Sequence, residues 1–230
     1  MKLRKIILFF PVLSILIGCA SSAKMNDAQF SEAERIRNEK AYDHYFQGVM
    51  LDFQDQYDKA LLEYYQALLY DSTSAQINKA IARNQMRLQN YESALIHLKR
   101  SFALNPDDKE TLNYLAEAYY NLNDHQESIY FYTKLLELDP YNETVQNNLI
   151  FLYTHLKQDQ KLIQFYQKMM GYYPNNSKFA IQYALANIRQ KNIAEAQKVL
   201  EDIIDQDSTE VEALQVLGNI YEINRDTLNA

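Results

Sequence analysis

The side chains that most often carry out catalysis or hold metals are scattered along this sequence. The histidines form no His-Glu-x-x-His pair, the helical arrangement that binds zinc in metalloproteases, and they share no helical face. They are His44, His97, His125 and His155. Asp202, Asp205 and Asp207 could attract a cation, but the turn glycine and the terminal glutamate of a calcium-binding loop are missing. Because the 4 glycines are also too far apart for a phosphate-binding loop, we expect no enzymatic activity, metal or cofactor here.

Two groups of residues instead have a spacing that suits binding. Lys79, Arg83 and Arg87 follow one another at i, i+4 and i+8, so on a helix they form a basic stripe. This basic stripe could hold an acidic peptide or a terminal carboxylate. The alternative is a solvated helix face that pairs with local acids.

The second group, Ile181, Leu185 and Ile188, forms an apolar stripe on its predicted helix. This apolar stripe could be an exposed docking strip for the helix of a partner protein. The alternative is burial against the next helix of the same chain, which we expect to begin near residue 211.

The single cysteine, Cys19, indicates a different chemistry. It follows a short basic start and an apolar run from Ile6 to Ile17. A run of about a dozen residues is too short to span a bilayer, but it suits a secretory signal peptide. The run ends in Leu16-Ile17-Gly18-Cys19, which resembles the bacterial lipobox. That resemblance implies cleavage after Gly18 and lipidation of Cys19; the alternative is a plain secretory signal that happens to contain a cysteine.

The region after Cys19 is expected to connect a membrane anchor to a folded domain. We expect a signal peptide at 1–18, a polar tether at 19–30 and a repeat domain at 31–230. Ser31 and Glu34 have the spacing of a capping box, which predicts that the first helix begins there. Enterobacterial lipoproteins retained in the inner membrane carry Asp after the cysteine. Since Ala20 stands there, the resemblance implies an outer-membrane anchor facing the periplasm.

Composition limits the classes of partner. Hydrophobic residues make up 47% of the chain and charged residues 23%, which is typical of a folded protein, and the scarcity of glycine and proline favours helices. The net charge of −7 becomes −10 without residues 1–18, since 20 basic residues then face 30 acidic ones. A surface with this much negative charge repels the phosphate backbones of nucleic acids and the anionic headgroups of lipids. We therefore expect protein partners, with no nucleic acid and no small-molecule substrate, and a membrane attachment that depends on the lipid.

The chain repeats itself every 34 residues. Ser72, Pro106, Pro140, Pro174 and Ser208 are evenly spaced. Numbering them as position 32 divides the sequence into repeats 41–74, 75–108, 109–142, 143–176 and 177–210, with a partial sixth from 211. Small residues recur at position 8, as in Gly48, Ala82 and Ala116, and at position 20, as in Ala60, Ala94 and Ser128.

Each repeat predicts two helices joined by a short turn. In repeat 3, Leu112, Leu115 and Tyr119 share one helical face, and a second helix follows from about Ser128. Between them, Asn121 to Asp124 suits a turn, because Asn tolerates the left-handed conformation that ends a helix and Asp can cap the next one.

This pattern resembles the tetratricopeptide repeat (TPR) over residues 41–230. The resemblance implies an all-α fold, an α-α superhelix (right-handed TPR solenoid) with five full repeats and a partial sixth, in which each hairpin stacks on its neighbours. Repeat 4 departs from the pattern with Ile150, Leu162 and Met169 at usually small positions. We expect its two helices to pack further apart. For Asn187, the role that we foresee is a hydrogen bond to a neighbouring backbone group.

In this family the first helix of each repeat lines a concave surface, chiefly through positions 2, 5, 9, 12 and 13. The resemblance therefore implies a protein-binding groove that contains the basic stripe, the apolar stripe and the residues between them. The remaining members are Tyr45, Val49, Asn113, Glu117, Tyr120, Asn147, Phe151 and His155. The carboxylate clamp of some TPR domains is matched only loosely, by Lys79 and Arg83.

Taken together, these features predict a lipid-anchored TPR scaffold or adaptor that mediates protein–protein interactions in cell-envelope assembly. The alternative is the targeting or regulatory half of a longer envelope enzyme, such as a TPR-linked peptidase. The last predicted helix bears on this choice because Val216, Ile220 and Ile223 stay apolar where a terminal cap should be polar. We therefore expect a fragment of a longer chain; the alternative is that this helix is itself the cap.

Overall fold

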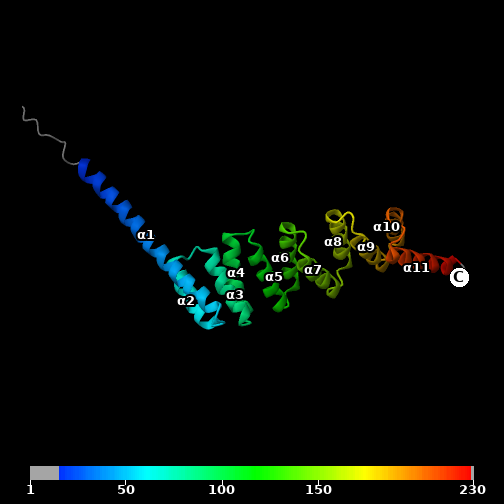
Figure 1. The fold of residues 1–230 in the computed structure, drawn as a ribbon, viewed down its shortest axis with the longest axis horizontal. Coiled ribbons are helices and arrows are strands. Elements are labelled where there is room, and N and C mark those ends of the chain that lie inside the picture. Colours follow the sequence, from blue (N-terminus) through cyan, green and yellow to red (C-terminus); the bar gives the residue numbers. More distant parts are fainter. Residues whose placement is uncertain (1–15, 229–230) are drawn as a thin grey trace, which may run out of the picture. The chain divides into compact units, whose positions relative to one another are not determined.

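The structure, a computed structural model, describes the backbone of residues 16–228 and the side chains of residues 31–222. Over this part of the chain it contains eleven α-helices and no strand (Figure 1). The helices are α1 (Leu16–Asp52), α2 (Tyr57–Tyr70), α3 (Ala75–Arg87), α4 (Tyr91–Leu104), α5 (Lys109–Asn121), α6 (His125–Leu138), α7 (Glu143–His155), α8 (Asp159–Tyr172), α9 (Ser177–Arg189), α10 (Ile193–Gln206) and α11 (Val211–Leu228). The chain divides into two compact units, residues 1–106 with α1–α4 and residues 107–230 with α5–α11.

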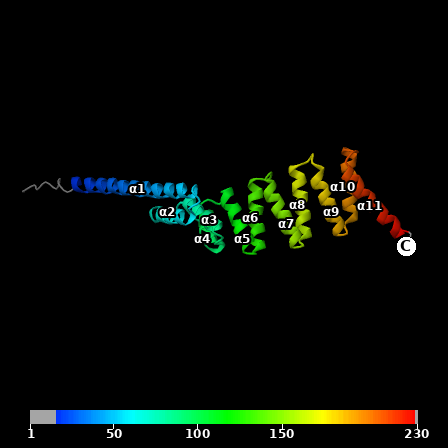
Figure 2. The same ribbon diagram turned by 60° about the horizontal axis from the view of Figure 1, so that its bottom comes forward.

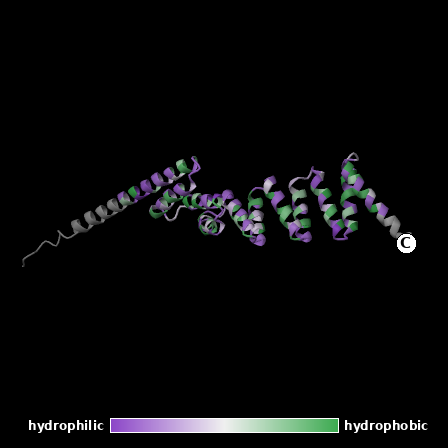
Figure 3. Cartoon of the chain, turned by 90° about the horizontal axis from the view of Figure 1, so that it is seen from below, coloured by the Kyte–Doolittle hydropathy of each residue, from purple (hydrophilic) through white to green (hydrophobic). Residues whose placement is uncertain are grey.

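The helix boundaries confirm the predicted phase of the repeat. In repeats 2 to 5 the first helix occupies positions 1 to 13 and the second occupies positions 17 to 30, without a slip. Within each unit, successive helices fold back on one another as hairpins (Figure 2). Hydrophobic and hydrophilic residues alternate along these helices (Figure 3), as expected where one face of each helix packs against its neighbours.

The turn inside each hairpin depends on one residue in the left-handed conformation. Position 15 has a positive φ, between 52° and 62°, in all five repeats, although only Asn123 and Asp55 belong to residue types that adopt it readily. The other three are Gln89, Lys157 and Lys191. The predicted cap at Asp124 is confirmed, since its carboxylate accepts a hydrogen bond from the backbone N–H of Glu127 at 3.4 Å.

The turn between repeats contains caps that the sequence analysis missed. At position 34, the side chains of Ser74, Asp108 and Asn142 each accept a hydrogen bond from the backbone N–H three residues later, at 3.0–3.2 Å. Asn176 caps α9 in a similar way, through the N–H of Lys178 at 3.0 Å. The signal was present in the sequence, because each of these polar residues follows position 32 by two residues.

The packing inside the hairpins explains the small residues. Ala82, Ala94, Ala116 and Ser128 are fully buried. A Cβ on Gly48 would lie 2.5 Å from the ring of Tyr64, so α1 and α2 can approach each other only because position 48 has no side chain.

The two helices of repeat 4 pack further apart, as we expected from its bulky residues. Leu162 and Met169 are buried, and the backbones of α7 and α8 approach each other less closely than those of the other four hairpins. The predicted role of Asn187 in repeat 5 is also confirmed, because its Nδ2 donates to the backbone oxygen of Tyr183 at 3.0 Å.

The first helix begins earlier than the capping box predicted. α1 starts at Leu16 rather than near Ser31, so residues 19–30, which we expected to form a tether, have a helical backbone. Nothing in the sequence interrupts the helix, since neither proline nor glycine occurs between Cys19 and Gly48. Most of the predicted signal peptide and the side chain of Cys19 lie outside the described residues. None of the described helices is long and apolar enough to cross a membrane.

The last helix docks through residues that include some expected on its outer face. Ala213, Leu217 and Ile220 are buried against the preceding hairpin, whereas Leu214 and Tyr221 are exposed. Ile220 therefore belongs to the core and not to the outer face, and Val216 is partly buried against the same cluster. The side chain of Ile223 lies outside the described residues.

Candidate functional site

The basic stripe of the first unit is occupied by contacts within the chain. Arg83 Nη2 donates to Asp52 Oδ2 at 2.5 Å, and Asp52 is only 8% exposed. The guanidinium of Arg87 lies over the ring of Tyr57, 4.7 Å from its centroid. Lys79 is half-buried and also has an interaction partner. These contacts favour the alternative interpretation, in which the stripe pairs locally.

Asp52 joins three helices of this unit. The hydroxyl of Tyr64 donates to the same carboxylate oxygen at 2.8 Å, so α2 and α3 are both tied to α1. Burial and this hydrogen bond raise the pKa of Tyr64 far above its usual value, which keeps the hydroxyl protonated. Tyr45 and Val49, predicted groove residues, pack half-buried against the cluster that contains Tyr64.

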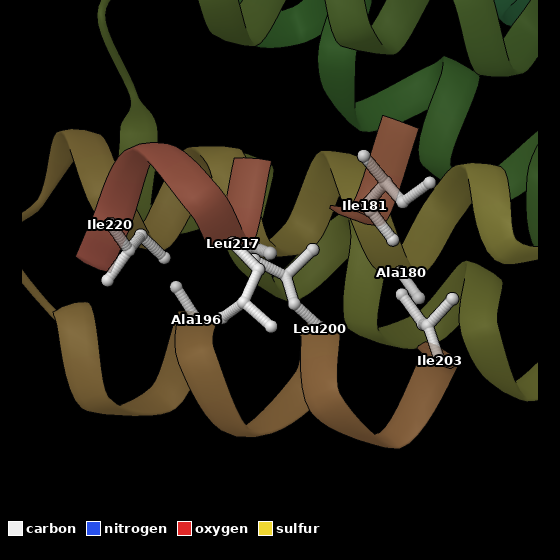
Figure 4. Packing of buried hydrophobic residues seen from close by; sticks show 9 residues of the cluster. Ala180, Ile181, Ala196, Leu200, Ile203, Leu217 and Ile220 are labelled. Atoms are coloured by element: carbon white, nitrogen blue, oxygen red, sulfur yellow. The ribbon is translucent and has the colours of Figure 1, made fainter. Parts of the chain in front are cut away.

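The apolar stripe of the second unit is also internal. Ile181 is 1% exposed and lies in one cluster with Leu200 and Leu217 (Figure 4). Leu185 and Ile188 are partly buried against the same cluster. Of the two interpretations, burial against the helix that begins near residue 211 is therefore confirmed at Ile181 and the exposed docking strip is wrong there, because α10 and α11 cover this part of α9.

Other predicted groove residues of the second unit come together at its surface. Tyr120 and Phe151 form a T-shaped ring pair with centroids 6.3 Å apart, and they remain 39% and 52% exposed. With Tyr132, Asn148 and Leu152 they line a cavity of about 300 Å³. One turn before Tyr120, Glu117 accepts a hydrogen bond from Asn113 Nδ2 at 2.7 Å. We call Glu117, Tyr120, Tyr132, Asn148, Phe151 and Leu152 the aromatic site.

The electrostatics of the aromatic site centre on Glu117 and Tyr132. Burial, followed by the charge of Glu117, raises the pKa of Tyr132 to about 12, so its hydroxyl stays protonated at neutral pH. The side chain of Asn148 offsets part of this rise in the pKa. Among residues 31–222, no cationic side chain pairs with Glu117. The site therefore combines aromatic walls with an unneutralised carboxylate.

Two histidines extend the aromatic site: they share no helical face, as expected, but their rings meet across two helices, α6 and α7. His155 stacks on Phe151 with centroids 5.7 Å apart, and His125 lies 5.6 Å from Tyr120 and 5.8 Å from His155. They belong to adjacent repeats, at positions 17 and 13. Comparing positions within a single repeat missed them, because the contact crosses from one repeat to the next.

The two units use the same register for these contacts. Position 12 of one repeat meets position 9 of the next: Asp52 meets Arg83 in the first unit, and Tyr120 meets Phe151 in the second. Position 17 likewise meets position 13 of the next repeat, as Tyr57 meets Arg87 and His125 meets His155. Equivalent positions therefore hold charged contacts in one unit and exposed rings in the other.

Asn147 lies apart from the aromatic site. It lines a separate cavity of about 280 Å³ between α7, α8 and α9, together with Gln146 and Tyr173. Gln146 Nε2 donates to the Tyr173 hydroxyl at 3.0 Å and to the backbone oxygen of Pro140 at 2.6 Å. The predicted groove residues are thus divided between two cavities of this unit.

One exposed surface escaped the sequence analysis. Tyr42, Phe46 and Met50 on α1, and Phe53 directly after its end, are 67%, 48%, 42% and 82% exposed. Their spacing of i, i+4, i+8 and i+11 places them on one helical face, and the rings of Tyr42 and Phe46 stack with centroids 6.4 Å apart. We call these four residues the α1 stripe. This periodicity is visible in the sequence, and Tyr42 and Phe53 occupy positions 2 and 13 of the first repeat, which are groove positions of the family.

Comparisons with known proteins agree with the helical arrangement. Two segments, residues 79–143 and 163–220, match family models described as tetratricopeptide repeat. Among solved structures, YrrB, described as a TPR protein with an unusual peptide-binding site, is 14% identical with a TM-score of 0.55, over 81% of this chain and 96% of YrrB. MamA from AMB-1 is 17% identical with a TM-score of 0.54, over 78% of this chain and 98% of MamA.

A third solved structure is a TPR domain in complex with a peptide. The first TPR of Spaghetti (RPAP3), bound to the HSP90 peptide SRMEEVD, is 23% identical with a TM-score of 0.50 and covers 52% of this chain and 95% of that domain. The search of curated proteins gave no match. At these identities the likeness is one of fold.

Proposed function

Because this chain is a tetratricopeptide-repeat protein, we propose that it is a scaffold that binds other proteins through the aromatic site. The observation that carries the proposal is the pair of exposed rings, Tyr120 and Phe151, which come from successive repeats and border a cavity. Aromatic side chains in this setting supply a large contact area at a small cost in side-chain entropy. The peptide-binding site of YrrB and the peptide bound to the RPAP3 domain are consistent with this use of the fold.

The α1 stripe supports a scaffold with more than one partner. Its four large apolar side chains are exposed on one face of α1 and directly after its end, in the other compact unit. Contiguous exposed apolar surface of this kind is typical of protein contacts. A chain that presents one such surface in each unit is suited to holding two proteins at once.

A site-specific crosslinking experiment tests the proposal. We would place a benzoylphenylalanine crosslinker at Phe151 and, as a matched control, at Tyr130, which is 49% exposed on α6 of the same unit. We expect defined crosslinked proteins from position 151 in intact cells and few from position 130. Equal labelling at both positions would contradict a specific contact surface at the aromatic site.

We further propose that the scaffold is a lipoprotein, anchored through Cys19 and acting in assembly of the cell envelope. The support is in the sequence: the Leu16–Cys19 match to the lipobox and the presence of a single cysteine. Two or three acyl chains would give a stable anchor. Mass spectrometry of the membrane fraction should find a chain that begins at Cys19 and carries lipid. A soluble form cleaved elsewhere would overturn this assignment.

A further inference from the structure

We propose that the aromatic site takes a cationic side chain, lysine or arginine, presented by a partner protein. This inference deepens the proposed function and rests on it. It follows from three features of the second unit. Aromatic residues line the cavity, Glu117 carries a negative charge, and the nearby lysines contact other residues.

The walls of the site are suited to a cation. Tyr120, Tyr132 and Phe151 border the cavity, and the face of an aromatic ring attracts an ammonium or a guanidinium group. The cavity of about 300 Å³ is large enough for one long side chain. Because Tyr120 and Phe151 are partly exposed, a side chain can enter from solvent.

The charge of the site selects the sign of the ligand. Glu117 lies one turn before Tyr120 on α5, is half-exposed, and is close enough to Tyr132 for its charge to raise the pKa of that hydroxyl. Among the described side chains, its carboxylate accepts a hydrogen bond only from the neutral amide of Asn113. An apolar ligand that covered this carboxylate would remove it from water without a partner, and an anionic ligand would be repelled. A lysine or arginine instead supplies a charge-assisted hydrogen bond together with a contact to the rings.

No cation of the surrounding segment fills this role. Residues 107–155 contain nine acidic residues and two basic ones, Lys109 and Lys134. Lys109 pairs with Asp139 at 3.1 Å, and Lys134 lies over the ring of Tyr130, 5.3 Å from its centroid. This differs from the first unit, where Arg83 of the chain itself reaches Asp52.

An NMR titration of the full protein in detergent tests the proposal. The probes are four capped tripeptides, Gly-Arg-Gly, Gly-Lys-Gly, Gly-norleucine-Gly and Gly-Glu-Gly. We expect saturable amide shifts in residues 117–120 and 148–152 with the arginine and lysine peptides. Norleucine, which has the lysine chain length without the charge, should bind at least tenfold more weakly, and the glutamate peptide should cause no shift.

Two matched variants locate the interaction. Glu117→Gln keeps an acceptor for Asn113 and removes the charge, so it should weaken binding of the arginine peptide about tenfold. Glu127→Gln removes an exposed charge on α6 outside the site and should leave binding unchanged. Equal affinities for norleucine and lysine, or unaltered binding by Glu117→Gln, would overturn the proposal.

The result is separable from the proposed function. If the cationic peptides do not bind while crosslinks from position 151 persist, the aromatic site binds proteins but not through a cation. If the cationic peptides do not bind and position 151 gives no crosslinks, the proposed scaffold function of this site is overturned as well.

Discussion

The two units place different chemistry at equivalent positions of the repeat. Where position 12 meets position 9 of the next repeat, the first unit has the Asp52–Arg83 ion pair and the second has the Tyr120–Phe151 ring pair. Position 24 is a tyrosine in both: Tyr64 donates to Asp52, whereas Tyr132 lies near the unpaired Glu117. The same geometry therefore holds a buried ion pair in one unit and an exposed ring pair in the other. The difference between the two units is whether the chain itself supplies a cation that neutralises the carboxylate.

The largest effect is expected from breaking the ion pair of the first unit. Arg83→Ala leaves Asp52 buried without its cation, and loss of one partner of a buried pair costs about 3–5 kcal/mol. Because the Arg83 side chain is 29% exposed, we expect a smaller loss, about 2 kcal/mol, in the free energy of unfolding. Urea denaturation followed by circular dichroism measures it.

The control for this prediction is the double variant Asp52→Asn with Arg83→Met, which removes both charges. It should be more stable than Arg83→Ala alone, because no uncompensated charge remains. If Arg83→Ala unfolds like the wild type, the ion pair does not stabilise the first unit. The basic stripe would then again be a candidate binding surface.

A smaller loss of stability is expected where α1 and α2 approach each other. Gly48→Ala places a Cβ 2.5 Å from the ring of Tyr64, and such overpacking costs about 1–3 kcal/mol, partly offset by about 1 kcal/mol of helix propensity. Gly218→Ala is the control, since no atom lies within 4 Å of the added Cβ, and it should be neutral or stabilising. Thermal unfolding of both variants gives the comparison; equal melting temperatures would contradict the close approach.

The fold was largely predictable because it is periodic. Five positions spaced by 34 residues determine the phase, and small residues such as Ala82 and Ala94 indicate where helices cross. The failures concern contacts between repeats. The sequence leaves open whether Arg83 binds a ligand or pairs locally, because its partner Asp52 is 31 residues away, and it does not indicate the contact of His125 with His155 for the same reason. Reading position 12 against position 9 of the next repeat would have found both.

Removing the rings of the second unit should separate binding from stability. Phe151 is 52% exposed, so Phe151→Ala should change the free energy of unfolding by about 0.5 kcal/mol or less. Capture of the proteins crosslinked by a probe at position 120 should nevertheless fall severalfold, because interface energy concentrates in aromatic anchors. Tyr130→Ala on α6 is the matched control and should leave capture intact. A large loss of stability from Phe151→Ala would instead assign the ring pair to the core.

The smallest change in stability is expected when the residue types of the first unit are introduced into the second. Tyr120→Asp combined with Phe151→Arg reproduces, in the second unit, the residue types found at positions 12 and 9 in the first. Tyr132 is buried beside them as Tyr64 is beside Asp52, but the new pair would be more exposed, and exposed pairs contribute about 0–1 kcal/mol. The coupling energy from a double-mutant cycle should therefore be about 0.5 kcal/mol, while the arginine tripeptide should no longer bind, because the new arginine competes for Glu117. Retained binding of that tripeptide would show that the rings and the unneutralised carboxylate are not what recognises a cation.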